Sequence, residues 1–252
     1  MMLSQAVELG RLVADGLLRL LYPPVCQVCG ERLDEGLKIG LCPACWRLVV
    51  LIKHPWCAAC GKPLLKKEIV DPRGENLCLD CRVLGGLSPV TLRGTALYRE
   101  PLVQLIKEFK YRFWPTLAEQ LSGLFAERAD ALFGAWRPVI IIPVPLHSKR
   151  LRWRGFNQSR LLAQRLAAHW GVPLGEPLVR VRNTVPQVKL PDEARLTNLA
   201  GAFAVGDPRA VDGRRVLLVD DVSTTGSTLL ECARELYKAG ATEVRAYVLA
   251  RP

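Results

Sequence analysis

Two adjacent carboxylates and a run of hydroxyl side chains form the most distinctive chemical pattern in the sequence. Asp220 and Asp221 directly follow the apolar run Val216–Val219, and a small, hydroxyl-rich turn continues to Thr228. A helix is expected from Leu229, and backbone N–H groups at a helix N-terminus bind phosphate with help from the helix dipole. The two carboxylates can accept hydrogen bonds from the vicinal hydroxyls of a ribose. The pattern therefore predicts a site for a ribose phosphate.

Two other classes of site fit this run less well. A phosphate-binding Walker loop requires Gly-Lys-Ser/Thr, which does not follow here. A receiver domain also has paired aspartates after a strand, but most of its sheet follows that pair. After Asp221 only one expected helix and one expected strand remain.

A strongly basic segment supports the same prediction. Between Ala131 and Gly175 there are seven Lys and Arg residues and no acid. We expect a basic loop after the buried strand Val139–Val144, facing the same sheet edge as Asp220. Guanidinium groups bind phosphate oxygens bidentately, so a pyrophosphate with its Mg²⁺ would suit this loop. The competing interpretation is a solvated charged loop. The candidate anion-binding residues are Lys149, Arg150 and Arg154.

Eight of the nine cysteines occur as four CxxC pairs, which indicates metal binding. Each pair places two sulfurs on a tight turn and supplies two corners of a tetrahedron. We predict two structural zinc ions, with iron–sulfur ligation as the minor alternative. Without a secretion signal, a reducing cytoplasmic location argues against disulfides. The eight predicted ligands are Cys26, Cys29, Cys42, Cys45, Cys57, Cys60, Cys78 and Cys81.

The spacing of the pairs also bears on how they share the metal. Sequential pairing, with Cys26/Cys29 joined to Cys42/Cys45 and the last two pairs joined to each other, needs the shortest loops. A crossed pairing is also compatible with the sequence. Gly30 and Gly61 directly follow two pairs, where a knuckle turn often needs positive φ. Cys232, the ninth cysteine, lies in an apolar helical pattern and is expected to be buried.

The rest of the chain alternates between strand-like and helical patterns. Apolar runs predict strands, and a period near 3.6 predicts helices between them. Strands separated by helices of about a dozen residues imply a parallel sheet covered on both faces. The expected strands are Thr91–Tyr98, Val139–Val144, Val216–Val219 and Val244–Leu249. The expected helices are Pro101–Tyr111, Thr116–Ala131, Arg160–Trp170 and Leu229–Ala239.

Composition and charge divide the chain into three parts. Residues 1–21 are predicted to form an amphipathic helix, residues 22–85 a double zinc ribbon and residues 86–252 an α/β domain. Residues 1–85 hold 11 basic and 9 acidic residues, whereas the formal net charge of the whole chain is +11. The α/β part therefore carries +9 and should meet anions. No uncharged apolar run approaches the roughly eighteen residues that span a membrane.

The run Val216–Leu229 resembles the signature of the phosphoribosyltransferase family with the Rossmann-like core. The resemblance implies that Asp220 and Asp221 hold the ribose hydroxyls. It implies that the 5′-phosphate of phosphoribosyl pyrophosphate is held by Thr224, Thr225, Gly226, Ser227 and Thr228. Together with four CxxC pairs and the run from Pro143 to Ser159, this pattern resembles the ComF/GntX family, from about Tyr22 to Arg251.

The ComF/GntX resemblance implies an α/β fold, with a Rossmann-like parallel sheet of the phosphoribosyltransferase type behind a small N-terminal zinc-ribbon domain. Members are associated with DNA uptake in competent bacteria. The segment from Arg182 to Phe203 looks like the family's mobile loop, from which Gln187 and Arg195 would reach the ligand. Lys107 and Lys110 resemble the family's basic entry helix. The Phe113-Trp114 pair departs from the small residues more usual there.

Three functions are compatible with these features. The first is a phosphoribosyltransferase that displaces pyrophosphate from the anomeric carbon, with an acceptor that no residue identifies. The second is a protein that binds single-stranded DNA and uses the site as a ligand sensor. Its supporting residues, Trp153 and Phe156 among the arginines of the basic segment, are also those of the pyrophosphate interpretation. The third is a scaffold whose zinc module docks a partner such as a helicase.

Overall fold

The computed structural model describes residues 24–33, 40–64, 76–83, 90–112, 114–184 and 199–252. Three predictions fall on other residues: the amphipathic helix at residues 1–21 and the ligand contacts of Gln187 and Arg195. No helix in the described ranges is both long and apolar enough to span a bilayer.

Four parallel strands form the central sheet, in the order β1-β6-β5-β2. Val219 of β5 lies between Tyr247 of β6 and Pro143 of β2. Residues 216–219 of the inner strand β5 and residues 246–251 of the inner strand β6 are all buried, which is typical of a parallel sheet covered on both faces. The strands are β1 (Thr91–Leu97), β2 (Ile140–Pro143), β5 (Arg215–Val222) and β6 (Glu243–Arg251).

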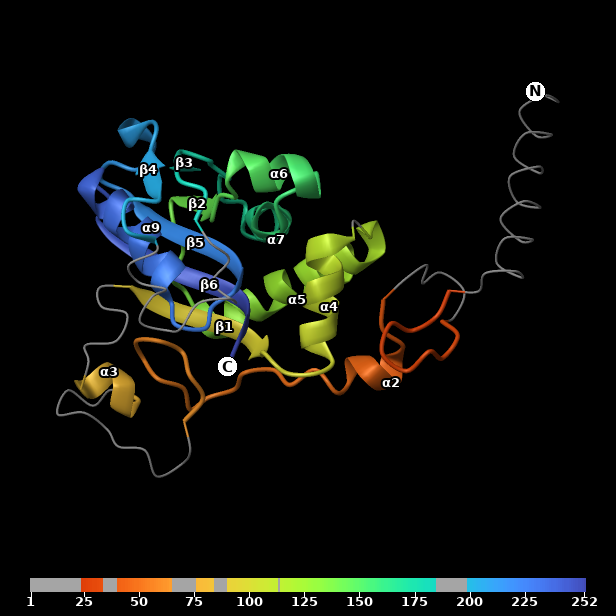
Figure 1. The fold of residues 1–252 in the computed structure, drawn as a ribbon. Coiled ribbons are helices and arrows are strands. Elements are labelled where there is room, and N and C mark those ends of the chain that lie inside the picture. The colour runs from red at the N-terminus through yellow and green to blue at the C-terminus, as the bar shows by residue number, and fades with distance from the viewer. Residues whose placement is uncertain (1–23, 34–39, 65–75, 84–89, 113, 185–198) are drawn as a thin grey trace, which may run out of the picture.

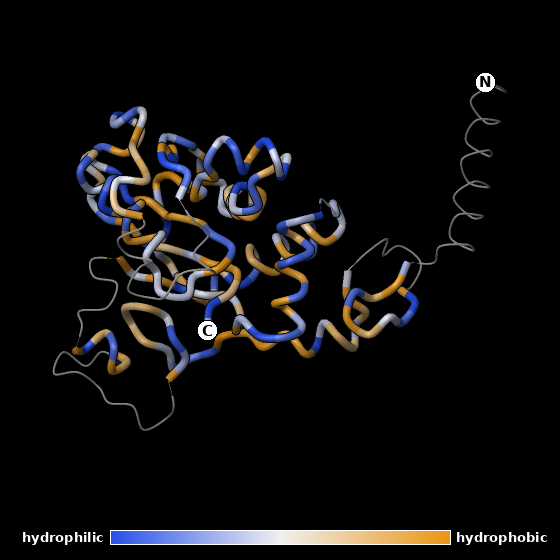
Figure 2. The backbone as a smooth tube through the Cα atoms, in the orientation of Figure 1, coloured by the Kyte–Doolittle hydropathy of each residue, from blue (hydrophilic) through white to orange (hydrophobic). Residues whose placement is uncertain are grey.

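Helices cover both faces of the sheet, as the alternating pattern predicts (Figure 1). The hydropathy colouring in Figure 2 shows apolar residues concentrated in the central strands. One face packs on α4 (Leu102–Tyr111), α5 (Pro115–Phe133) and α7 (Gln158–Trp170). The other packs on α9 (Ser227–Lys238) and on an antiparallel pair formed by β3 (Leu178–Arg180) and β4 (Phe203–Val205).

A buried tyrosine ties the first helical layer to the sheet. The Tyr247 ring stacks on Phe125 of α5 at 3.8 Å between centroids. The Tyr247 hydroxyl donates to the Phe125 carbonyl and accepts from the Thr95 hydroxyl, each at 2.8 Å. Because both hydrogen-bonding roles of the hydroxyl are filled, this large side chain is fully buried without an unmet polar group.

The predicted basic loop is wrong: its residues form a helix, α6 (Ser148–Arg154). His147 caps its start by accepting a hydrogen bond from the Lys149 amide, and Gly155 ends it in the left-handed region at φ 81°. No residue of α6 is buried. An apolar period could not reveal a helix that buries no apolar face.

The zinc segments pair directly with the outer edge of β1. Leu97 N–H donates to Val50 O at 2.8 Å, and Ile52 N–H donates to Thr95 O at 3.0 Å. Further along, Leu92 N–H donates to Ala59 O at 2.8 Å. An edge strand exposes unpaired backbone groups, so residues 50–59 protect the sheet on this side.

Short helices complete both zinc segments, at opposite ends of the β1 edge (Figure 1). These are α2 (Pro43–Trp46) and α3 (Leu79–Val83); a 3-10 turn, Pro208–Ala210, precedes β5. Three cysteines of the first segment, Cys26, Cys42 and Cys45, join the core on the α5 face, and all four of the second join the core on the α9 face. The ribbon is therefore packed along the sheet rather than separate from it.

The knuckle glycines Gly30 and Gly61 both have positive φ, at 74° and 69°, which confirms the prediction. Their surroundings differ. A Cβ on Gly30 would meet nothing within 4 Å, whereas a Cβ on Gly61 would lie 2.5 Å from Leu92 O. The second knuckle therefore needs glycine both for its φ and for its contact with β1.

Substitution of these two glycines by alanine separates the two requirements. Gly30→Ala should cost only the left-handed backbone penalty, about 1 kcal/mol. Gly61→Ala should cost roughly 3 kcal/mol or more, because the clash also disturbs the Leu92 pairing. Thermal unfolding and zinc content of both variants measure the difference. Equal losses would contradict the close packing of the second knuckle on β1.

Candidate ribose-phosphate site

The acidic pair lies near the C-terminal end of β5, inside the strand rather than after it. The predicted strand ended at Val219, but pairing continues to Val222, which lies opposite Ala250 of β6. Asp220 Oδ1 accepts from the Asp221 amide at 2.9 Å, and Asp221 Oδ1 accepts from the Val222 amide at 2.8 Å. Both carboxylates are therefore fixed by local backbone bonds at the carboxyl end of the sheet.

Side chains from two helices hold the carboxylates. Lys110 of α4 forms an ion pair with Asp221, with 2.9 Å between Nζ and Oδ2. The Ser159 hydroxyl of α7 donates to Asp220 Oδ1 at 2.7 Å. The Asn157 side chain caps α7 by accepting from the Ser159 amide, and its own amide donates to Val144 O. The strand β2 thus places the start of α7 against the acidic pair.

The pKa values of Asp220 and of Lys110 both depart from their ordinary values. Burial and the neighbouring Asp221 charge raise the pKa of Asp220 to about 7, although the Ser159 hydroxyl opposes the change. Burial works against the charge of Lys110, but the Asp221 carboxylate outweighs it and raises the pKa of Lys110. The site therefore holds one charged ion pair and one carboxyl that titrates near neutral pH.

The hydroxyl-rich turn leads from this pair into α9. Gly226 is the N-cap residue, with φ 81°, and it supplies no side-chain acceptor to the helix. Thr225 Oγ1 lies 2.7 Å from Ser227 Oγ, and both Thr224 and Thr225 are exposed. Ser223 is buried, and its hydroxyl has no hydrogen-bond partner in the described ranges. The turn thus places side-chain hydroxyls next to the N-terminus of α9.

Arginines from α6 and β3 lie beside the acidic pair. Arg154 donates to Gln158 Oε1 at 2.6 Å, and burial lowers its pKa although Asp221 opposes this. Arg150 donates to Thr184 O at 3.0 Å, and Arg180 donates to Thr184 Oγ1. Burial and then the Arg150 charge lower the pKa of Arg180. Three guanidinium groups therefore gather near the end of the sheet that carries Asp220 and Asp221. Those of Arg150 and Arg180 both donate to Thr184.

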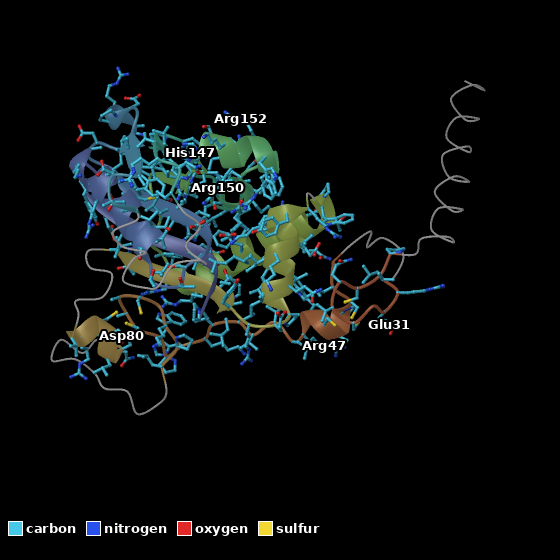
Figure 3. All side chains as sticks on the ribbon, viewed as in Figure 1. Glu31, Arg47, Asp80, His147, Arg150 and Arg152 are labelled. Carbon is cyan, nitrogen blue, oxygen red and sulfur yellow. The ribbon has the colours of Figure 1, made fainter. Side chains whose placement is uncertain are left out.

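The structure does not bring every candidate to the site. Lys149 is exposed at the start of α6, and its side chain has no ion pair or hydrogen bond with the described site residues. Figure 3 shows Arg150 and Arg152 at the top of the view, whereas Arg47 and Asp80 lie at the bottom with the zinc segments. Lys107 of the expected entry helix is exposed.

Sequence reasoning assigned no contact to three residues that touch this site. Only the family resemblance pointed to Lys110. Ser159 lies at the end of the run from Pro143 that carries the resemblance, but no contact was predicted for it. Arg180 had no signal, because its place depends on how β3 packs beside α6.

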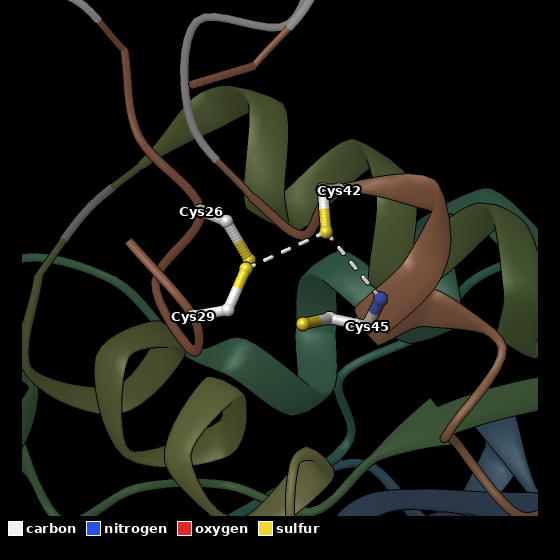
Figure 4. A group of neighbouring side chains, drawn as sticks. All are labelled: Cys26, Cys29, Cys42 and Cys45. Carbon is white, nitrogen blue, oxygen red and sulfur yellow. Dashed lines mark hydrogen bonds between the residues drawn. The ribbon is translucent and has the colours of Figure 1, made fainter. Parts of the chain in front are cut away.

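Each zinc segment brings four cysteines together, in the sequential pairing. The first group is Cys26, Cys29, Cys42 and Cys45 (Figure 4), and the second is Cys57, Cys60, Cys78 and Cys81, with all sulfurs of a group within 4.8 Å of one another. The Cys29–Cys42 and Cys60–Cys78 sulfurs are 3.7 Å apart. A tetrahedron with Zn–S bonds of about 2.3 Å has edges of about 3.8 Å. Both groups are therefore four-cysteine sites consistent with two structural zinc ions.

Knuckle amides complete these two sites. Cys45 N–H points to Cys42 Sγ at 3.4 Å, and Cys60 N–H points to Cys57 Sγ at 3.5 Å. Such bonds stabilise thiolate sulfur. The first site leaves Cys29 exposed, whereas all four cysteines of the second are buried. Cys232 is fully buried away from both groups, and burial raises the pKa of its thiol, as expected for an apolar packing residue.

Comparison with known proteins identifies the family. Residues 17–82 match the double zinc ribbon domain, and residues 156–252 match the phosphoribosyl transferase domain. Competence protein F of Haemophilus influenzae is 35% identical over 242 residues, which cover 90% of this chain and 96% of that protein. The chain belongs to the ComF/GntX family. The DNA utilization protein YhgH of Escherichia coli K12, another ComF/GntX relative, is 35% identical over 92% of this chain and 99% of its own length.

Solved phosphoribosyltransferase structures share only a weak overall likeness with this chain. A purine phosphoribosyltransferase from Pyrococcus horikoshii Ot3 covers 53% of this chain and 81% of its own, with 21% identity and a TM-score of 0.32. That likeness is too slight to carry weight by itself. The family match and the parallel sheet together give this ComF/GntX protein a phosphoribosyltransferase-type domain behind two four-cysteine sites.

The variant Asp220→Asn tests the cost of burying this carboxyl. Its folded pKa of about 7 exceeds the ordinary value of 3.8, so the folded state retains a proton between these values that the unfolded chain loses. Wild-type stability should therefore fall as the pH rises from about 4 to about 7. Asparagine keeps an oxygen for Ser159 without the charge, so the variant should be more stable at about pH 8, by roughly 1–3 kcal/mol. Calorimetry across this range measures the gap, which should shrink toward pH 4; a gap independent of pH would contradict the assignment.

Proposed function

We propose that this protein binds phosphoribosyl pyrophosphate with Mg²⁺ at the β5–α9 site and transfers its phosphoribosyl group. One observation carries the proposal: a fixed acidic pair at the end of β5 leads directly into a hydroxyl-rich turn and a helix start whose N-cap residue, Gly226, supplies no side-chain acceptor. Ribose hydroxyls need acceptors and a 5′-phosphate needs donors. The two sets stand next to each other, in the order that such a ligand requires.

Unpaired donors around the site support an anionic ligand. Ser223 Oγ, Arg154 Nε and Arg180 Nε are buried and lack hydrogen-bond partners in the described part of the chain. A buried donor without a partner costs about 1–3 kcal/mol, so an arriving acceptor recovers that loss. Oxygen-rich phosphate and pyrophosphate groups are suitable acceptors, since each presents several charged oxygens.

In this proposal each residue has a positioning or electrostatic task. Asp220 and Asp221 accept from the ribose hydroxyls. Thr224, Thr225, Gly226, Ser227 and Thr228 surround the 5′-phosphate. Arg150 and Arg154 face the pyrophosphate, and Lys110 keeps Asp221 charged and oriented. Gln187 and Arg195 are proposed to approach from the segment between β3 and β4.

The donor set also fits Mg²⁺. This ion prefers carboxylate and phosphate oxygens, and it neutralises charge on the leaving pyrophosphate when it is bound. Because Lys110 already occupies one Asp221 oxygen, most of the ion's oxygen ligands would come from the pyrophosphate. The acidic pair then contributes chiefly through the ribose.

The reaction needs no covalent nucleophile from the protein. Displacement of pyrophosphate breaks the bond at the anomeric carbon and leaves positive charge on the ribose ring in the transition state. Positioning of the sugar and stabilisation of both charges can supply the rate. In this proposal the Asp220 and Asp221 carboxylates, which hold the sugar hydroxyls, also help to stabilise the positive ring.

The relatives suggest the cellular setting. Their printed names refer to competence and to DNA utilization. We place this protein in the same setting, acting in DNA uptake or in the use of the resulting nucleotides.

A single-stranded DNA-binding protein that uses the site as a sensor is the second candidate. Exposed Arg152 and Trp153 on α6 favour it. Phe156, which the sequence grouped with them, packs on Phe109 with 6.2 Å between ring centroids and joins the core. Of the two predicted aromatic residues, only Trp153 is thus available to stack on single-stranded DNA. The third candidate is a scaffold whose zinc segments dock a helicase-type partner.

The test is to measure binding of phosphoribosyl pyrophosphate with Mg²⁺, and release of pyrophosphate across a panel of bases and single-stranded DNA. Asp221→Asn should weaken binding about tenfold or more, because a charged acceptor is lost. Asp207→Asn is the matched control, since Asp207 pairs with Arg209 at the surface.

Each result has a defined meaning. Release that requires one acceptor and is lost in Asp221→Asn establishes the transferase and names its substrate. Saturable binding without release supports the sensor. Wild-type protein with both zinc ions that binds no ligand contradicts the proposed site.

A further inference from the structure

Two exposed aromatic side chains touch each other near the proposed site. Tyr111 is 63% exposed and Trp153 is 72% exposed, and these are the only exposed Tyr, Trp or Phe side chains among the residues that the structure describes. Their rings meet edge to face, with 5.9 Å between centroids and an angle of 71°. An edge-to-face pair leaves ring surface uncovered, so the pair presents aromatic area to solvent.

The pair does not serve the core. Helix α6, which carries Trp153, buries no residue, and Tyr111 is the last residue of α4. The other partly exposed tryptophans of the described ranges pack against a core cluster, as Trp46, Trp56, Trp114, Trp136 and Trp170 do. Trp153 and Tyr111 contribute little burial, so folding does not explain why two large rings meet here.

The pair stands directly beside the residues that hold the acidic pair. Tyr111 follows Lys110, whose ammonium contacts Asp221. Trp153 precedes Arg154, whose guanidinium lies over the Tyr111 ring at 5.6 Å from the centroid. The same guanidinium feels the charge of Asp221. Two helices far apart in the chain thus bring an aromatic pair and a cation to the Asp221 side of the site.

Flat rings beside cations bind flat, polarisable ligands. Stacking on an exposed aromatic contributes on the order of 1–3 kcal/mol per nucleobase, and it tolerates any base because every base has a π-face. A protein partner needs roughly 800 Å² of contact from each side, which two side chains flanked by like charges do not supply. A nucleobase attached to, or about to join, a ribose phosphate fits both the rings and their position.

We propose that Trp153 and Tyr111 form a stacking site for a nucleobase next to the ribose-phosphate site. The inference rests on the proposed function, whose acceptor it narrows to a planar base, and it adds a residue pair that would bind the base. Arg154 holds the Tyr111 ring in place and faces the phosphate-bearing side. The base is held by its faces, so the site should discriminate weakly among the four bases.

The experiment is calorimetric titration of the full zinc-loaded chain with three probes: ribose 5-phosphate, nucleoside 5′-monophosphates and an oligodeoxythymidylate. The wild type should bind monophosphates about tenfold more tightly than ribose 5-phosphate. Trp153→Ala should remove this advantage and leave ribose 5-phosphate affinity unchanged, whereas Trp153→Phe should keep most of it. Leu151→Ala is the matched control, because Leu151 is an exposed apolar residue of the same helix.

The arms of the experiment separate the sources of the base and the two proposals. If Trp153→Ala weakens monophosphates alone, the base is a small-molecule acceptor or product; if it also weakens the oligonucleotide, the base can belong to a strand. If ribose 5-phosphate fails to bind but the oligonucleotide still depends on Trp153, the stacking site stands and the proposed function fails. If the base adds no affinity, or if Trp153→Ala weakens ribose 5-phosphate equally, the stacking site is wrong.

Discussion

Two carboxylates on neighbouring residues at the end of a buried strand are the feature around which the other elements are arranged. Adjacent like charges in a partly dry setting repel each other, and only positioned partners make them tolerable. Lys110 arrives from α4, Ser159 from α7, and the field of Arg154 from α6. The start of α7 is placed in turn by the Asn157 cap on β2. Three helices, α4, α6 and α7, thus each deliver a group to the acidic pair.

The zinc segments contribute to the same sheet along its β1 edge. Metal binding can supply about 10 kcal/mol per ion to the folding of small segments such as these. Once folded, their backbone satisfies the outer edge of β1, and Arg93 donates to Ala58 O at 2.8 Å. The four-cysteine sites and the candidate ribose-phosphate site are therefore parts of one hydrogen-bonded sheet system. Their chemistry is separate, but their stability is shared.

Much of this could be predicted from sequence because the signals were local. CxxC pairs, the two knuckle glycines and the apolar strand runs each depend on a few neighbouring residues, and the parallel sheet and both four-cysteine groups confirm them. Long-range features left no such trace. No pattern in residues 50–52 predicts their pairing with β1. No pattern near Arg180 predicts that it shares Thr184 with Arg150. Helix α6 was missed because capping by His147 and Gly155 defines it, whereas its apolar residues show no period. The domain limits and the ligand roles stay predictions.

The contact between the last strand and the second knuckle affects how the protein is made. Arg251, at the end of β6, is buried and donates to the carbonyl of Cys60 in that knuckle, across 191 residues of sequence. Its stem fills the space beside Gly94, where a side chain would collide with it. Synthesis proceeds from the N-terminus, so the second knuckle leaves the ribosome long before the strand that completes its surroundings. During that interval the knuckle lacks its packing against β6, so a zinc ion bound at this stage would hold the four cysteines together until the last strand arrives.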